Sequence, residues 1–175
     1  IMITAHRREN LGKPMENMFR AIRRVMDEHD DVKAIYPIHM NPVVREIANN
    51  ILGDDDRIHI IEPLEVVDFH NFLDRSYMIL TDSGGIQEEA PSLGKPVLVM
   101  RDTTERPEGI AAGTLKLVGT TEDIIYQNFK TLLDNEVVKF DFQVNDLFDI
   151  LDTVLLFHPN IPIIGISLPG IIRDG

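Results

Sequence analysis

Residues 77–91 decide the fold that we expect; they read Tyr77-Met78-Ile79-Leu80-Thr81-Asp82-Ser83-Gly84-Gly85-Ile86-Gln87-Glu88-Glu89-Ala90-Pro91. Tyr77 to Thr81 favour a strand, two glycines follow, and the residues after Gly85 have helical character. Such a strand-turn-helix presents unpaired backbone N–H groups at the positive end of a helix dipole, and glycine leaves room for close approach. A diphosphate suits this turn.

The glycine turn alone does not identify a ligand. It is not the G-x-G-x-x-G dinucleotide fingerprint, and no lysine follows the glycines as in a P-loop. The alternative interpretation is a tight strand-helix connection that needs glycine only for its backbone angles. The neighbouring segments must decide between the two.

Strands and helices alternate on both sides of this turn. Expected strands occupy residues 2–4, 32–38, 57–61, 77–81, 97–100 and 115–118, with helical segments between them. Asn41 followed by Pro42 indicates a helix start, and Gly53 indicates its end. The alternation predicts an α/β fold with a Rossmann-like, doubly wound parallel sheet.

The domain that we expect spans residues 1–140. Residues 141–175 are punctuated by proline and glycine and do not continue the alternation. We expect this divergent C-terminal tail to pack on the same domain. The chain starts at Ile1 inside an apolar run, which suggests a piece of a longer protein.

Composition excludes several classes of function. The 175 residues carry a net charge of −12 with a pI of about 4.8, which argues against nucleic acid or an anionic membrane as a partner. Cysteine is absent, so disulfides and thiolate catalysis are excluded. No apolar run reaches the ~18–20 residues of a membrane span, and no metal-site spacing occurs. We expect a cytoplasmic globular protein.

Polar clusters follow four of the expected strands, at His6–Asn10, His39–Pro42, Ser83–Glu89 and Arg101–Glu108. The carboxyl ends of parallel strands lie along one edge of a sheet, so these clusters should converge. Their arginines would supply cations for an anionic ligand, and arginine can grip a phosphate with two hydrogen bonds.

Each candidate side chain has a functional and a structural interpretation. His6 can donate a proton to a leaving phosphate or merely cap a strand end, and His39 carries the same ambiguity. Glu88 and Glu89 can be explained by the helix dipole, but one of them can also accept hydrogen bonds from ribose hydroxyls. Phe69 fits a helix core better than a base-stacking platform when judged by spacing alone.

Four motifs together resemble the non-hydrolysing bacterial UDP-N-acetylglucosamine 2-epimerases: His6-Arg7-Arg8-Glu9-Asn10, His39-Met40-Asn41-Pro42, Asp82-Ser83-Gly84-Gly85 with Glu88-Glu89-Ala90-Pro91, and Thr104-Glu105-Arg106-Pro107-Glu108. The match reaches about residue 134 and corresponds to the C-terminal half of that family, which is one half of a glycosyltransferase-B-type fold. It implies interconversion of UDP-GlcNAc and UDP-ManNAc by elimination and re-addition of UDP, for cell envelope polysaccharide biosynthesis, without a metal or other cofactor.

The resemblance also implies roles for single residues. His6 corresponds to the active-site histidine near the diphosphate. The implied UDP contacts are Phe69 at the uracil, Glu89 at the ribose, Ser83, Gly84 and Gly85 at the diphosphate, and Arg106 as a phosphate-side cation. Arg7 and His39 match positions that contact a second, activating UDP-GlcNAc in some members of the family.

Two departures from the family pattern limit what the chain should do alone. The family's N-terminal domain, which supplies most of its catalytic carboxylates, has no counterpart in this sequence. We therefore expect UDP binding without turnover. After about residue 134 the family's Asn-Pro-Tyr-Gly-Asp-Gly stretch is also missing. The family is commonly dimeric, so the resemblance implies a homodimer, whose contacts in the family involve parts that this sequence lacks.

Two other functions compete with this interpretation. A B-type UDP-sugar transferase is suggested by Glu89-Ala90 followed by Gly94-Lys95-Pro96-Val97. The residues eight positions after Glu88 and Glu89 are Pro96 and Val97, so the paired glutamates of retaining transferases are missing. The second competitor is a non-catalytic UDP-sugar-binding module, which predicts binding without turnover even when the partner domain is restored.

Overall fold

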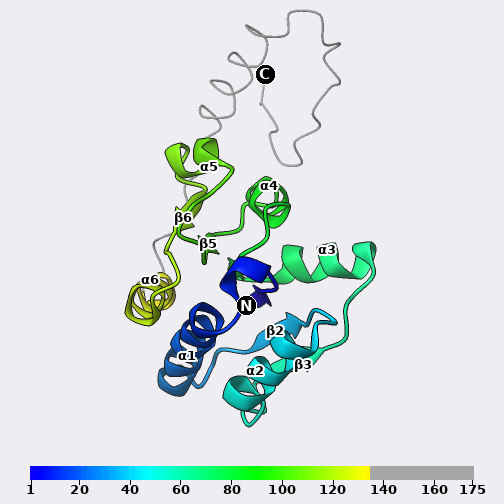
Figure 1. Cartoon of the computed structure of the whole chain (residues 1–175). Coiled ribbons are helices and arrows are strands. Elements are labelled where there is room, and N and C mark those ends of the chain that lie inside the picture. Colours follow the sequence, from blue (N-terminus) through cyan, green and yellow to red (C-terminus); the bar gives the residue numbers. More distant parts are fainter. Residues whose placement is uncertain (135–175) are drawn as a thin grey trace, which may run out of the picture. The chain divides into compact units, whose positions relative to one another are not determined.

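A six-stranded parallel sheet forms the centre of the fold. The computed structural model describes residues 1–134 (Figure 1), so the domain end predicted at residue 140 and the tail at 141–175 lie outside the described residues. The strands are β1 (Met2–Thr4), β2 (Ala34–Pro37), β3 (Ile58–Ile61), β4 (Ile79–Thr81), β5 (Val97–Val99) and β6 (Leu115–Leu117). Their order is β3-β2-β1-β4-β5-β6, and every neighbouring pair is parallel.

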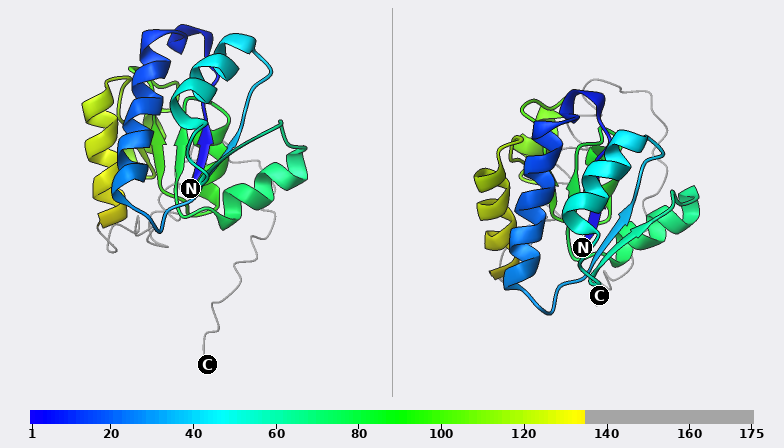
Figure 2. Two further views of the ribbon diagram at one scale, coloured as in Figure 1. Left: turned by 90° about the horizontal axis from the view of Figure 1, so that it is seen from below. Right: turned by 60° about the horizontal axis from the view of Figure 1, so that its bottom comes forward.

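Helices cover both faces of this sheet. The α-helices are α1 (Lys13–Glu28), α2 (Pro42–Leu52), α3 (Val66–Arg75), α4 (Ile86–Ser92), α5 (Pro107–Ala111) and α6 (Glu122–Asp134), and a short 3-10 helix, η1, spans Arg8–Asn10. Figures 1 and 2 show α1, α2 and α6 on one face and α3 on the other. The predicted Rossmann-like, doubly wound sheet is confirmed. Among the helices of residues 1–134, none is both long and apolar enough to cross a membrane.

The two hydrophobic layers follow from the alternation of side chains along each strand. Ile3 belongs to the layer that α1 fills with Phe19 and Ile22. Its neighbour Met2 belongs to the opposite layer, together with Leu73 of α3. Successive residues of a strand point to opposite faces, so even a three-residue buried strand contributes to both cores.

The ends of α2 follow the local sequence closely. The side chain of Asn41 accepts a hydrogen bond from the backbone N–H of Val43 at 3.0 Å, and Pro42 is the first helical residue, as predicted. Gly53 caps the C-terminal end, as expected. Its φ of −73° is right-handed, so the left-handed conformation common at such ends is not used here.

Asp82, directly after β4, ties that strand to the loop after β1. Its carboxylate is fully buried and accepts hydrogen bonds from the backbone N–H groups of His6, at 3.0 Å, and Arg7, at 2.9 Å. The side-chain amide of Asn10 donates a further bond at 3.1 Å. The buried hydroxyl of Tyr36 donates a hydrogen bond to the carbonyl of Ala5 at 2.6 Å, so β2 is also bonded to this junction of β4 with the loop after β1.

Burial raises the pKa of the Tyr36 hydroxyl, and the negative charge of Asp82 raises it further. The phenol therefore stays protonated and keeps its bond to the carbonyl of Ala5. The hydroxyl of Tyr36 and the carboxylate of Asp82 thus both have hydrogen-bond partners in the low-dielectric interior, where an unpaired polar group is costly.

Outside the junction, an ion pair joins the end of α1 to the end of α6. His29 has Nδ1 at 3.0 Å from the carbonyl oxygen of Val25 and Nε2 at 3.0 Å from Oδ1 of Asp134. Both ring nitrogens face acceptors, which suits the protonated imidazolium. The bond to Asp134 raises the pKa of His29 and lowers the pKa of Asp134.

Replacing Asp82 by asparagine should lower the free energy of unfolding by about 2–3 kcal/mol. The new amide turns an N–H group toward backbone N–H donors that now bind a charged acceptor. Urea denaturation checks this value. Asp74→Asn, on the exposed surface of α3, is the matched control and should change stability by less than about 0.5 kcal/mol. Equal effects of the two variants would contradict the role of Asp82.

Stability should also depend on pH through His29. Its pKa is higher in the folded than in the unfolded chain, so its contribution is complete below an unfolded pKa of about 6.5 and is lost as pH rises through the folded pKa. The pKa of Asp134 is lowered, so its carboxylate stays ionised, and the ion pair stays formed, at pH values below the ordinary range of aspartate pKa values. We expect the stability difference between wild type and His29→Gln to be larger at about pH 5.5 than at about pH 9.

The same comparison in an Asp134→Asn background is the control for this pH effect. There the stability difference that His29→Gln produces should lose most of its pH dependence, because the partner charge is gone. Denaturation curves at the two pH values give all the differences. A pH dependence that survives in the Asp134→Asn background would show that another group titrates.

Candidate functional site

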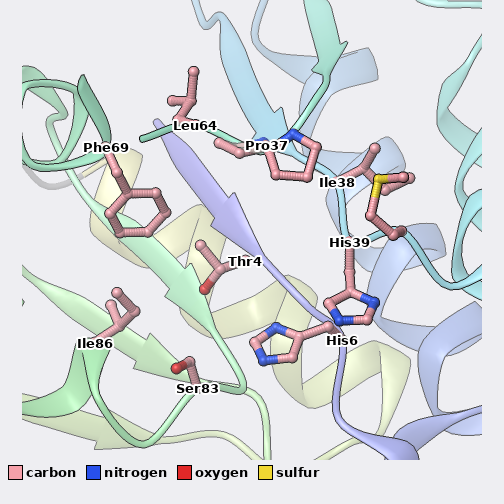
Figure 3. A pocket seen from close by; sticks show the side chains of 11 residues that line it. Thr4, His6, Pro37, Ile38, His39, Leu64, Phe69, Ser83 and Ile86 are labelled. Atoms are coloured by element: carbon pink, nitrogen blue, oxygen red, sulfur yellow. The ribbon is translucent and has the colours of Figure 1, made fainter. Parts of the chain in front are cut away.

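A pocket of about 370 Å³ lies beyond the carboxyl ends of β1, β2 and β4. The chain leaves β1 and β4 in opposite directions across the sheet, and open α/β sheets bind ligands at such a switch point. The lining residues are Thr4, His6, Pro37, Ile38, His39, Met40, Pro63, Leu64, Phe69, Ser83 and Ile86 (Figure 3). Residues from three of the four predicted polar clusters thus line the same pocket.

Two stacked histidines form one wall of the pocket. The rings of His6 and His39 have centroids 5.4 Å apart and an interplanar angle of 11°. Oδ1 of Asp82 lies 3.7 Å from Nδ1 of His6, and Asp82 also holds the His6 backbone. An imidazole fixed in this way beside a partly apolar hollow can donate a proton to, or accept one from, a bound molecule.

Hydroxyl groups fix the start of the glycine turn. The side-chain oxygens of Thr4 and Thr81 lie 2.6 Å apart, so the ends of β1 and β4 are bonded across the switch point. Thr81 also accepts a hydrogen bond from the backbone N–H of Ser83 at 2.9 Å. Thr4 and Ser83 both line the pocket, so these bonds set the position of its floor.

The two glycines of the turn do not have the backbone angles that only glycine adopts. Neither Gly84 nor Gly85 has a positive φ, and Gly85 is right-handed with φ −62° and ψ −40°. A Cβ added to Gly84 would lie 3.0 Å from Nη2 of Arg7 and 3.1 Å from Oε2 of Glu105. The interpretation that the glycines are needed for backbone angles is therefore wrong. At Gly84 the missing side chain makes room for an ion pair.

The arginines of this rim are paired with carboxylates. Arg7 lies 3.4 Å from Glu105, and Arg101 lies 3.2 Å from Glu105 and 2.8 Å from Glu9. The bond from Arg101, with the further attraction of Arg7, lowers the pKa of Glu105. Arg106 pairs with Glu88 at the start of α4. An anionic ligand would meet cations whose charge is already partly balanced.

Arg101 connects the loop after β5 to the loop after β1. Its side chain is only 6% exposed, and its Nε and Nη1 atoms are buried without a hydrogen-bond partner in the described part of the chain. Next to it, the hydroxyl of Thr104 donates to Gln87 of α4 at 2.6 Å. The fourth predicted polar cluster therefore packs against the glycine turn and α4 but does not line the pocket.

Phe69 and Glu89 lie on neighbouring helices at the other side of the turn. Phe69 of α3 is half-buried against the second core, as its helical spacing predicted, and it also lines the pocket. Figure 3 shows its ring across the hollow from His6. Glu89 of α4 has Oε2 at 3.0 Å from Nε2 of His70.

The predicted site residues are thus gathered at one edge of the sheet, in two groups. Four line the pocket: His6, His39, Phe69 and Ser83. Five lie beside it: Arg7, Gly84, Gly85, Glu89 and Arg106. Within residues 1–134, no group of three or more His, Cys, Asp or Glu side chains is placed to hold a metal ion.

Sequence reasoning missed the supporting residues Asp82, Glu105 and His70. Asp82 and Glu105 lie inside two of the four motifs, and this position could have marked them as candidates. His70 follows Phe69 in a helix, and nothing in its neighbourhood in the sequence indicates that it meets Glu89.

Comparison with known proteins supports the family resemblance that the four sequence motifs indicate. Residues 1–149 match the family model described as UDP-N-acetylglucosamine 2-epimerase. The protein of that name from Bacillus subtilis (strain 168) is 71% identical over 133 residues, which are 76% of this chain and 35% of the relative. The chain therefore spans about a third of the length of the curated relatives that it matches.

Two solved structures are similar over most of this chain. The S. aureus MnaA-UDP co-structure has a TM-score of 0.78 and 53% identity, covering 91% of this chain and 46% of that one. The UDP-GlcNAc 2-epimerase from Neisseria meningitidis bound to UDP-GlcNAc has a TM-score of 0.78 and 41% identity, covering 90% and 44%. The partial coverage agrees with one half of a glycosyltransferase-B-type fold. The four motifs identified the family correctly, and the chain belongs to the UDP-N-acetylglucosamine 2-epimerase family.

Proposed function

We propose that this chain is the UDP-binding half of a UDP-N-acetylglucosamine 2-epimerase. The observation that carries the proposal is the pocket at the switch point, where His6, Phe69 and Ser83 meet in a chain of this family. Similar structures that contain UDP or UDP-GlcNAc support the choice of ligand. The sheet edge provides the surface expected for a nucleotide in a doubly wound fold.

In the proposed binding mode the nucleotide lies across the carboxyl ends of β1 and β4. Phe69 contacts the uracil, and Glu89 accepts hydrogen bonds from the ribose. The diphosphate lies against Ser83, Gly84 and Gly85, with Arg106 as its cation. The ion pair between Arg106 and Glu88 supports this role, since the guanidinium is held at the first turn of α4, close to the glycines.

The proposed reaction removes UDP from the sugar and adds it back. The bond from C1 to the diphosphate oxygen breaks as the C2 proton is taken, which leaves 2-acetamidoglucal and UDP. The reverse step places a proton on the opposite face of C2 and reforms the bond at C1. His6 donates a hydrogen bond or a proton to the leaving diphosphate, which lowers the cost of the negative charge that develops there.

The groups that handle the C2 proton belong to the N-terminal domain in this proposal. The chain covers 35% of its Bacillus subtilis relative, so most of that protein lies outside this sequence. Arg7 and His39 remain candidates for contacts with a second, activating UDP-GlcNAc, and a homodimer remains the proposed assembly. His39 stacks on His6, so a ligand there would affect the same pocket wall.

Calorimetric titration with UDP should give saturable binding that weakens about tenfold in both Arg106→Ala and Glu89→Ala. Each variant removes one charged hydrogen-bonding group from the proposed contacts. Arg75→Ala on α3 and Glu46→Ala on α2, both exposed and away from the pocket, are the matched controls and should bind as the wild type does. Absence of saturable heat in a chain shown to be folded by circular dichroism would contradict the half-site.

Epimerisation should be undetectable with the chain alone and should appear when the N-terminal domain of the Bacillus subtilis relative is joined to it. In the joined protein, His6→Gln should lower kcat by about 10²–10⁴-fold. The loop should keep its position, because the backbone bonds to Asp82 do not involve the ring. NMR measures the rate at which UDP-GlcNAc and UDP-ManNAc are interconverted.

Three outcomes, with the joined protein or with the chain alone, would oppose the proposal. UDP binding without recovered activity would favour a non-catalytic UDP-sugar-binding module. Transfer of the sugar to an acceptor would favour a B-type glycosyltransferase. Turnover by the 175-residue chain alone would show that the N-terminal domain is dispensable.

A further inference from the structure

A hydrogen bond between α3 and α4 fixes the orientation of Glu89. Nε2 of His70 lies 3.0 Å from Oε2 of Glu89, and the two side chains are about half exposed. The other carboxylate oxygen, Oε1, is turned toward the glycine turn. It lies 3.7 Å from the position that a Cβ on Gly85 would occupy. The carboxylate therefore has one oxygen on the imidazole and one near Gly85.

His70 is held in place by its own helix. Its neighbour Phe69 is anchored in the second core and lines the pocket, and the two rings have centroids 6.4 Å apart. α3 therefore presents two consecutive side chains to the site, one at the pocket and one at Glu89. A neutral imidazole with its proton on Nε2 is sufficient to donate this bond, because the carboxylate only accepts.

An isolated glutamate on an exposed helix samples several rotamers, and a ligand that binds it must pay for ordering it. The bond from His70 reduces that cost before the ligand arrives. A carboxylate also has about four lone-pair sites on its two oxygens, so Glu89 can still accept bonds from two adjacent hydroxyl groups while His70 holds it.

We propose that His70 is a positioning residue that makes this site select a ribonucleoside diphosphate over its deoxy analogues. The inference rests on the proposed function, because Glu89 reads a ribose only if the nucleotide binds as described above. His70 itself does not touch the ligand. It acts by holding the carboxylate toward the turn, so that the 2′ and 3′ hydroxyls meet an acceptor that is already oriented.

The test compares the affinities of the full 175-residue chain for UDP and for 2′,3′-dideoxy-UDP by calorimetry. His70→Phe keeps a ring but removes the donor, and it should weaken UDP binding about three- to tenfold. Binding of the dideoxy compound should change much less, so the preference for UDP falls. His70→Gln keeps an N–H donor and should retain most of the preference.

A double variant separates positioning from general damage to the fold. In the Glu89→Ala background, His70→Phe should have no further effect on the preference, because the carboxylate that it orients is gone. Circular dichroism and thermal melting check that each variant is folded. The inference would be overturned if His70→Phe lowered the preference for UDP as much in the Glu89→Ala background as it does in the wild type.

The remaining outcomes distinguish this inference from the proposed function. A preference that falls in Glu89→Ala but not in His70→Phe would overturn the role of His70 and leave the ribose contact of Glu89 intact. A preference unchanged in Glu89→Ala would overturn both the ribose contact and the role of His70. Failure of UDP to bind the wild type at all would contradict the proposed function itself.

Discussion

The structure depends on one buried carboxylate. Asp82 ends β4 and accepts hydrogen bonds from the backbone of His6 and Arg7 and from the side chain of Asn10. These residues follow β1, the strand beside β4 at the switch point. A buried charge is tolerated only when its hydrogen-bonding capacity is filled, so the two loops must meet in this arrangement. The positions of His6, the glycine turn and the pocket follow from it.

Ion pairs between arginines and glutamates hold together the loops beside the pocket. Arg7, Arg101 and Arg106 are brought to one rim, and each pairs with a glutamate of a neighbouring loop or helix. Arg101 is nearly fully buried and connects two loops, so its charge mainly serves the structure. Arg106 is more exposed and pairs with Glu88 in the first turn of α4. The same residues thus hold the rim together, and the glutamates balance much of the charge of the arginines.

Much of the fold and part of the site could be predicted from the sequence. Apolar periodicity is a local property, and it predicted the alternation of strands and helices. The residue types Asn41 and Pro42 predicted the helix cap, and the parallel topology predicted that polar clusters converge at one edge. Each of these features is present in the structure. The motif-based roles of Glu89 and Arg106 remain predictions, since they concern contacts with a ligand.

The sequence by itself determined the doubly wound architecture and the family, because periodicity and motif order are carried by residues near one another in the chain. Only the tertiary structure decided what lies against Gly84 and what contacts Glu89. Gly84 has no positive φ, and the side-chain ends of Arg7 and Glu105 lie against it, so a Cβ there would make these two ends shift. His70 meets Glu89 across two helices. Such contacts join distant segments, and their geometry exists only after the sheet has placed its loops side by side.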